Sequence, residues 1–282
     1  MFKYKKRGQI TLFILVSIFI VCINLILFYV FRNYEIGKNF FIFESPQKAI
    51  VNNERKFIQE CLDYSLNNTL REMLMQGGYY IIENDYVYYN RRERIEQSID
   101  GLVKVPIYYD SKFVDYSLFP SIKDLEEQFL KGILNEMYSC LDYEDYEEEE
   151  DNSSNAILII NLSNSNIGII IKDDKVIVNT LLDIKVQFED KVYVIDKYTT
   201  SINTDFLKLY NLALNMTLIQ RIYHDVVCIQ CNSELASKYD FNLNSYDYYE
   251  ENGDYVLIYN LKFKNSKSNE IFSFAHRIRR NT

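Results

Sequence analysis

The chain has 282 residues, of which 31 are Lys or Arg and 40 are Asp or Glu, so its net charge is −9. Eight Gly and three Pro are too few for a collagen-like or low-complexity chain, whereas 25 Tyr and 18 Phe favour β-strands. An acidic surface repels polyanions, which excludes nucleic acid and anionic headgroups as expected partners of that surface.

Residues 10–31 contain no charged side chain, and 17 of these 22 residues are Leu, Ile, Phe or Val. A helix of this length spans roughly 33 Å, enough to cross a hydrocarbon layer of about 30 Å. Four basic residues and no acidic ones lie in residues 1–9, and the positive-inside rule keeps such a segment in the cytoplasm. We therefore expect a basic cytoplasmic tail over 1–9, a single transmembrane helix over 10–31 in the lipid bilayer, and an extracellular remainder.

A cleaved secretory signal is the alternative interpretation of this segment. Its apolar core is normally about 7–15 residues and ends in small residues at the cut. The apolar stretch here is longer and is followed by Arg32-Asn33-Tyr34-Glu35, which offers no such site. A retained anchor in the cell membrane is therefore predicted, and residues 33–282 outside it carry 26 basic against 40 acidic residues.

Two helices are predicted within a membrane-proximal region over 32–142. Ser45 and Pro46 suit a helix cap and first position, apolar residues then recur three and four apart, and Gly77-Gly78 supplies the stop. A second helix is predicted over 122–141, with Ser121 as its cap.

Between these helices the sequence favours strands. Residues 79–82 and 86–89 flank a short polar turn and predict a small hairpin. Residues 103–109 predict a further strand, in which Pro106 suits a sheet edge because proline lacks the backbone N–H.

An acidic loop over 143–155 is predicted to separate this region from an antiparallel α+β domain over 156–282. One helix is expected over 206–223 to pack on the sheet of that domain. The predicted strands are 156–161, 167–172, 175–180, 184–188, 191–195, 255–263 and 271–278. The fold class is thus α+β, with one N-terminal transmembrane helix, a long membrane-proximal helix and a sheet-rich ectodomain with packed helices.

Five cysteines are present, and Cys22 lies inside the predicted span. Cys61 and Cys140 lie on the two predicted helices of an exported domain, where oxidised pairs are common. Closing a loop of about 80 residues would restrict the unfolded chain by roughly 4 kcal/mol. We take Cys61 to Cys140 as the expected long-range disulfide.

Cys228 and Cys231 form a C-x-x-C motif with three interpretations: a local disulfide, a thiol redox site, or half of a zinc site. A redox site requires a strand before the motif and a helix after it, and zinc requires further ligands. His224 could supply one ligand, but we expect it to mark the end of the preceding helix. A structural disulfide, or a pair of buried thiols, is favoured.

No catalytic constellation, cofactor motif, metal site or small-molecule substrate is predicted. The chain has two histidines, His224 and His276, and lacks G-x-S-x-G, H-E-x-x-H and a Gly-rich phosphate loop. The chain is therefore expected not to be an enzyme. Its glycosylation candidates are the N-x-S/T acceptors Asn67, Asn152, Asn161 and Asn215.

Residues 5–13, with the sequence KKRGQITLF, resemble the N-terminus of archaeal type IV pilin-like proteins with a class III signal. The resemblance implies processing between Gly8 and Gln9, which would remove the basic tail and leave the apolar helix. Pilins normally carry an acidic residue at the fifth mature position, where this chain has Phe13.

A wider pattern is similar to uncharacterised single-span envelope proteins of small-genome archaea. It is carried by Cys61, by Gln76-Gly77-Gly78-Tyr79, by Val105-Pro106 and Pro120-Ser121, by Cys140-Leu141 and by Phe274-Ala275. This resemblance also implies the Cys61 to Cys140 bridge.

These features predict a membrane-anchored extracellular protein with a structural, adhesion or assembly role at an archaeal cell envelope, related in one possibility to pilins. Its expected partners are other envelope proteins or further copies of itself. Two alternatives remain: an envelope thiol-disulfide enzyme that uses the C-x-x-C motif, and a binding ectodomain of a larger membrane complex.

Overall fold

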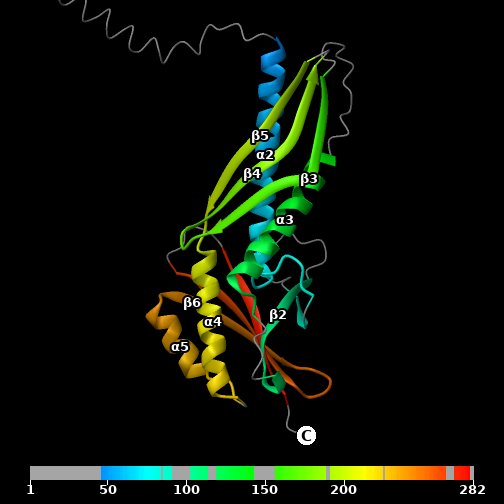
Figure 1. Cartoon of the computed structure of the whole chain (residues 1–282). Coiled ribbons are helices and arrows are strands. Elements are labelled where there is room, and N and C mark those ends of the chain that lie inside the picture. Colours follow the sequence, from blue (N-terminus) through cyan, green and yellow to red (C-terminus); the bar gives the residue numbers. More distant parts are fainter. Residues whose placement is uncertain are drawn as a thin grey trace, which may run out of the picture. The chain divides into compact units, whose positions relative to one another are not determined.

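The computed structural model describes residues 46–83, 85–90, 102–113, 119–142, 156–188, 191–224, 226–264 and 270–279. Its architecture is α+β, as predicted (Figure 1). The chain divides into two compact units, residues 1–50 and residues 51–282. The packing described below lies within the second unit. The predicted transmembrane helix over 10–31 lies outside the described residues, and none of the helices within them has the length and apolarity needed to cross a bilayer.

The first described helix, α2, spans Pro46–Met75, as the Ser45-Pro46 start predicts. Gly77 and Gly78 have φ angles of +54° and +82°, a region that strains any residue with a Cβ atom. The Gly78 N–H donates to the Met73 carbonyl at 2.6 Å, so the glycine pair ends the helix as predicted.

The second helix, α3, spans Ile122–Asp142 and is capped by Ser121. The Asp124 N–H donates to Ser121 Oγ at 3.2 Å, and the Ser121 N–H donates to Asp124 Oδ2 at 2.7 Å, which is a reciprocal capping box. A Cβ atom at Gly132 would lie 2.8 Å from Thr69 Oγ1, so this glycine lets α3 approach α2 closely.

A three-stranded antiparallel sheet contains β3 (Ala156–Ile171), β4 (Lys175–Phe188) and β5 (Lys191–Asn203), in that order. Figure 1 shows it running alongside α2 and α3. The prediction of five short strands here is wrong, because the polar segment over 161–166 and the Leu-Leu-Asp-Ile segment over 181–184 are irregularities within long strands. They lie opposite each other in the sheet, so regular pairing resumes on both sides of them.

A five-stranded sheet has the order β1-β2-β8-β7-β6, with β2 and β8 parallel and the other neighbours antiparallel. Residues on the two sides of the predicted acidic loop over 143–155, which lies outside the described residues, therefore share one sheet. Its strands are β1 (Tyr86–Asn90), β2 (Leu102–Asp110), β6 (Phe241–Tyr249), β7 (Tyr255–Phe263) and β8 (Phe272–Ile278). The helices after β5 are α4 (Phe206–Ile222) and α5 (Ile229–Lys238).

The sequence analysis misplaced two features of this sheet. Residues 79–82 form no strand, and the hairpin joins β1 to β2 instead. Pro106 lies in β2, which is an internal strand of the sheet and not an edge strand. Residues 102–106 pair with β1, and pairing with β8 begins at Ile107, so β2 changes its pairing partner next to Pro106. The missing N–H is tolerated at this change of partner.

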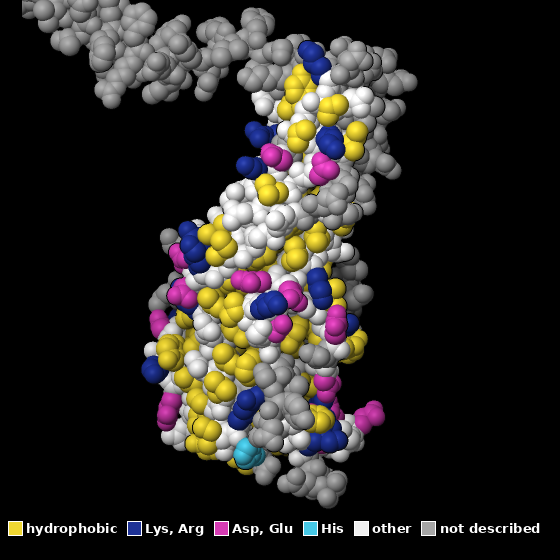
Figure 2. Space-filling model, in the orientation of Figure 1, with side chains coloured by type: hydrophobic (Ala, Val, Ile, Leu, Met, Phe, Trp, Pro, Cys, Tyr) yellow, Lys and Arg dark blue, Asp and Glu magenta, His cyan; other side chains and the backbone are white. Residues whose placement is uncertain are grey.

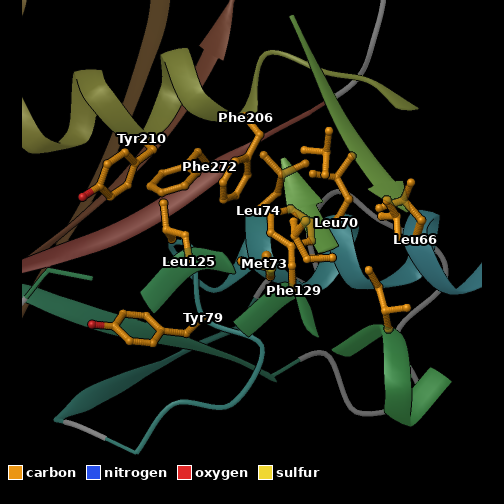
Figure 3. Packing of buried hydrophobic residues seen from close by; sticks show 14 of the residues in the cluster. Leu66, Leu70, Met73, Leu74, Tyr79, Leu125, Phe129, Phe206, Tyr210 and Phe272 are labelled. Atoms are coloured by element: carbon orange, nitrogen blue, oxygen red, sulfur yellow. The ribbon is translucent and has the colours of Figure 1, made fainter. Parts of the chain in front are cut away.

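The main hydrophobic core contains buried side chains from α2, α3 and α4 and from both sheets. Figure 3 shows its centre, where Phe206 from α4 and Phe272 from β8 lie beside Phe129 from α3. The Phe129 and Phe206 rings meet edge-on at 5.2 Å between centroids, and those of Phe206 and Phe272 at 6.0 Å. These rings connect α3 and α4 to the five-stranded sheet.

Candidate functional site

The C-x-x-C motif lies at the start of α5, with Cys228 as the residue that caps the helix. The Cys231 N–H donates to Cys228 Sγ at 3.2 Å. The structure joins the two sulfurs as a disulfide, with the Cα atoms 5.3 Å apart, and both residues are half-buried. A helix N-terminus stabilises negative charge, so this position favours a thiolate on Cys228 when the disulfide is reduced.

Five large apolar side chains that are exposed to solvent precede Cys228 in the sequence or lie between the two cysteines. They are 43–72% exposed, and Figure 2 shows hydrophobic side chains at the surface where Figure 1 places α4 and α5. We call them the α4–α5 apolar patch: Leu218, Ile222, Tyr223, Val226 and Ile229. Clusters of exposed apolar side chains are typical of surfaces that bind another protein.

Hydrogen bonds from beneath hold the turn between α4 and α5 in place. The buried Gln220 donates through Nε2 to the Val226 carbonyl at 2.8 Å. Asn232 Nδ2 donates to the Tyr259 hydroxyl at 3.0 Å, and the Tyr109 hydroxyl donates to the His224 carbonyl at 3.1 Å. These contacts attach the turn to β2 and β7, so the apolar patch rests on a fixed base.

His276 lies fully buried beneath α4, with Nε2 at 3.0 Å from Thr217 Oγ1. The rings of Tyr109, Tyr259 and Phe274 surround it, with centroid distances of 4.9–5.8 Å. Burial lowers the pKa of His276 to about 3, so the side chain is neutral at pH 7. A fully buried, neutral imidazole without solvent access has a structural role rather than a catalytic one.

The other predicted histidine, His224, is exposed and follows the end of α4, as the sequence indicates. Among the described residues, no group of three or more His, Cys, Asp or Glu side chains could hold a metal ion. The structure therefore does not bring His224 and the two cysteines together as a metal site.

An ion network lies at one end of the five-stranded sheet. Arg279 donates from Nε to Asp110 Oδ1 at 2.8 Å and from Nη2 to Oδ2 at 2.7 Å. Arg277 contacts Asp85 and also donates to Glu250 at 2.9 Å. Burial by itself would raise the pKa of Asp110, but the bonds from Arg279 and from the Lys112 N–H outweigh it and lower that pKa. These carboxylates are bound to arginines, which indicates a structural network.

Cys61 and Cys140 are joined in the structure by the second disulfide, with 5.9 Å between their Cα atoms. The bridge connects α2 to the last turn of α3 across 79 residues of sequence. Cys61 is almost fully buried, unlike either cysteine of the C-x-x-C motif.

The remaining predicted sites are only partly described. Asn67 and Asn215 are exposed on α2 and α4, but the hydroxyl residues of their sequons, Thr69 and Thr217, are fully buried. A glycosylating enzyme that must contact both the Asn and the Thr side chain of such a sequon must therefore act before these helices form. Asn161 lies in β3, whereas Asn152 and the processing pair Gly8 and Gln9 lie outside the described residues.

The sequence analysis missed two residues that build the site, Gln220 and Asn232. Both are polar side chains that are buried at the faces of α4 and α5 turned toward the sheet. Gln220 does follow Met216 and Ala213 at helical spacing, which is the one signal that could have revealed it.

No protein-family model, curated protein or solved structure matches the chain. The functional interpretation therefore rests on the amino-acid sequence and on the geometry of the site.

Proposed function

We propose that the chain is a single-span protein of the cell envelope whose extracellular α+β domain docks another envelope protein or a second copy of itself. The observation that carries this proposal is the α4–α5 apolar patch. Five large apolar side chains are exposed within residues 218–229, on the last turns of α4, on the connection that follows and on the first residue of α5. Hydrogen bonds fix this connection to the sheet. A rigid apolar surface costs little ordering entropy on binding, which favours docking.

The anchor is the second part of the proposal and rests on residues 1–32. The uncharged stretch over 10–31 and the basic tail before it support a transmembrane helix with the cytoplasmic end at the N-terminus. The two disulfides are compatible with an oxidising location outside the cell. A relation to pilin-like proteins adds processing between Gly8 and Gln9, which mass spectrometry of the mature N-terminus tests: an intact Met1 would remove it.

The docking role is tested with the double variant Ile222→Asp and Ile229→Asp in the full chain in its native membrane. Carboxylates at two highly exposed positions should leave folding intact but disrupt an apolar interface. Chemical crosslinking should then lose the wild-type adduct. The matched control is Val194→Asp, an apolar residue on β5 that is 61% exposed, against 72% for Ile222 and 71% for Ile229. Retention of the adduct in the double variant, or its loss in the control, would contradict docking through this patch.

Thiol-disulfide exchange is a second candidate function, favoured by the position of Cys228 at the N-terminus of α5 with a backbone N–H on its sulfur. Only half of the expected redox context is present, because a helix follows the motif but α4 and a turn, rather than a strand, precede it. In such an exchange a thiolate of a partner protein attacks one sulfur of the disulfide, and the other sulfur leaves as a thiolate. A second thiol of the partner, once deprotonated, attacks the partner's sulfur in this mixed disulfide, and the remaining cysteine of the motif leaves as a thiolate. Two electrons then pass from the partner dithiol to Cys228 and Cys231, and the partner gains a disulfide.

An exposed dithiol peptide tests this second function directly. The oxidised wild-type protein should convert the peptide to its disulfide in one stoichiometric turnover, and Cys228→Ser with Cys231→Ser should abolish this conversion. Equal conversion by the double variant would exclude the motif as the oxidant.

A further inference from the structure

A groove of about 410 Å³ lies between α2 and β5, away from the α4–α5 apolar patch. Its walls come from residues 52–59 of α2 and 197–199 of β5. Gln59 holds the two walls together, because its Nε2 donates to the Thr199 carbonyl at 3.4 Å. The groove is thus built from two elements that are far apart in sequence.

The groove is basic although the chain is acidic. Arg55, Lys56 and Lys197 line it, and none of its lining residues within the described part of the chain is acidic, although Glu54 and Asp196 lie near Tyr198. Lys56 forms an ion pair with Glu60 at 3.5 Å on the surface of α2. Within the part of the chain that the structure describes, no ion pair involves Arg55 or Lys197. Two cations from opposite walls are therefore available to an anionic ligand.

Tyr198 supplies a second, independent observation. This residue lines the groove and is 5% exposed, yet its hydroxyl has no hydrogen-bond partner among the described residues. A buried polar group without a partner costs about 1–3 kcal/mol. Burial, with Asp196 and Glu54 nearby, raises the pKa of Tyr198 to about 12 despite the opposing charge of Arg55, so its hydroxyl keeps its proton. The hydroxyl remains a donor at neutral pH.

We propose that this groove binds a phosphate group through Arg55, Lys197 and the Tyr198 hydroxyl. The planar guanidinium of arginine matches phosphate oxygens in pairs, and lysine adds a point charge. The phosphate belongs either to the headgroup of a membrane lipid or to free phosphate in solution. Net charge predicts that the acidic surface repels anionic headgroups, and the groove is a local exception to that prediction. The proposal does not depend on the docking role of the α4–α5 end.

The first test is a calorimetric titration of the full chain in neutral detergent with inorganic phosphate at constant ionic strength. The double variant Arg55→Gln and Lys197→Gln should weaken binding at least tenfold, and Tyr198→Phe should weaken it about fivefold, the loss of one hydrogen bond. The matched control is Lys191→Gln, an exposed lysine at the start of the same strand.

The second arm uses bilayer nanodiscs with zwitterionic lipid alone or with a phosphate-monoester lipid added. Protection of residues 52–59 from hydrogen exchange only with the added lipid, abolished by the double variant, would identify the headgroup as the source. Phosphate binding in the first arm without such protection would identify free phosphate. Wild-type behaviour of the double variant in both arms, or no binding in either, would overturn the proposal.

Discussion

The two cysteine pairs lie in regions with opposite properties. In the α2–α3 region the Cys61–Cys140 disulfide joins two helices whose facing side chains are apolar and deeply buried. In the α4–α5 region the Cys228–Cys231 disulfide joins residues three apart at a half-buried helix start, and the side chains beneath it are polar. The first disulfide constrains a long stretch of chain, whereas the second constrains almost none.

This difference assigns different roles to the two regions. A scaffold gains most from a disulfide that closes a long loop and from close apolar packing. A surface that meets a partner needs exposed side chains on a fixed base, which the α4–α5 region supplies. We therefore interpret α2 and α3 as the scaffold and the α4–α5 turn as the functional end.

The largest expected effect is the loss of the scaffold disulfide. Replacing Cys61→Ser together with Cys140→Ser should lower the free energy of unfolding by about 4 kcal/mol, since the unfolded chain regains the entropy of a long loop. Replacing both cysteines of the C-x-x-C motif should cost about 2 kcal/mol by the same relation. Chemical denaturation measures both. Equal losses would remove the distinction between the two regions.

Acid should weaken the α4–α5 region through His276. The unfolded chain binds a proton on this histidine near pH 6.5, whereas the folded chain does so only near pH 3. Stability should therefore fall by about 1.4 kcal/mol per pH unit as the pH drops from 6.5 towards 3, or about 3 kcal/mol over two units.

Denaturation at several pH values measures this slope, and His276→Phe should reduce it by that amount. The variant keeps an aromatic ring among Tyr109, Tyr259 and Phe274, and Thr217 Oγ1 keeps its bond to the Ala213 carbonyl at 2.9 Å. An unchanged slope in His276→Phe would show that this residue is not the group that titrates.

The close approach of α2 and α3 can be tested at Gly132. Gly132→Ala places a Cβ atom 2.8 Å from Thr69 Oγ1 and 2.9 Å from Tyr80 Cδ2, so the helices must separate or distort. Such overpacking typically costs about 2 kcal/mol. Gly168→Ala is the matched control, because its Cβ would meet only the Asn179 carbonyl at an ordinary 3.8 Å. A thermal melt in which both variants behave alike would argue against tight packing here.

The smallest effect is expected at the α3 cap. Ser121→Ala removes the hydroxyl that accepts from the Asp124 N–H and should cost about 1 kcal/mol. Ser139→Ala, on the exposed face of the same helix, should change stability by less than half as much. Urea denaturation distinguishes the two, and the reverse ranking would show that the cap contributes nothing.

The elements that the sequence predicted well are those with local signals. Ser45-Pro46 and Gly77-Gly78 place both ends of α2, Ser121 places the start of α3, and the apolar spacing after Phe206 identifies α4. Each signal depends on residues within a few positions of one another, so no tertiary information is needed.

The elements that the sequence missed depend on distant partners. Strand β6 is mostly exposed, so its sequence alternates weakly, and pairing with β7 defines it. Polar residues inside β3 predict a turn, but the neighbouring β4 carries the strand through them. The C-x-x-C motif was visible, whereas its place at the start of α5 and the buried Gln220 beneath it depend on tertiary packing.

The most direct test of the contrast between the two regions is stepwise reduction of the native protein, with alkylation and mass spectrometry at each reductant concentration. We predict that Cys228 and Cys231 become alkylated first, under conditions in which the fold is intact. Cys61 and Cys140 should remain joined until the protein unfolds. Reduction of Cys61–Cys140 first, or of both pairs together, would contradict the assignment of α2–α3 as scaffold and the α4–α5 turn as the functional end.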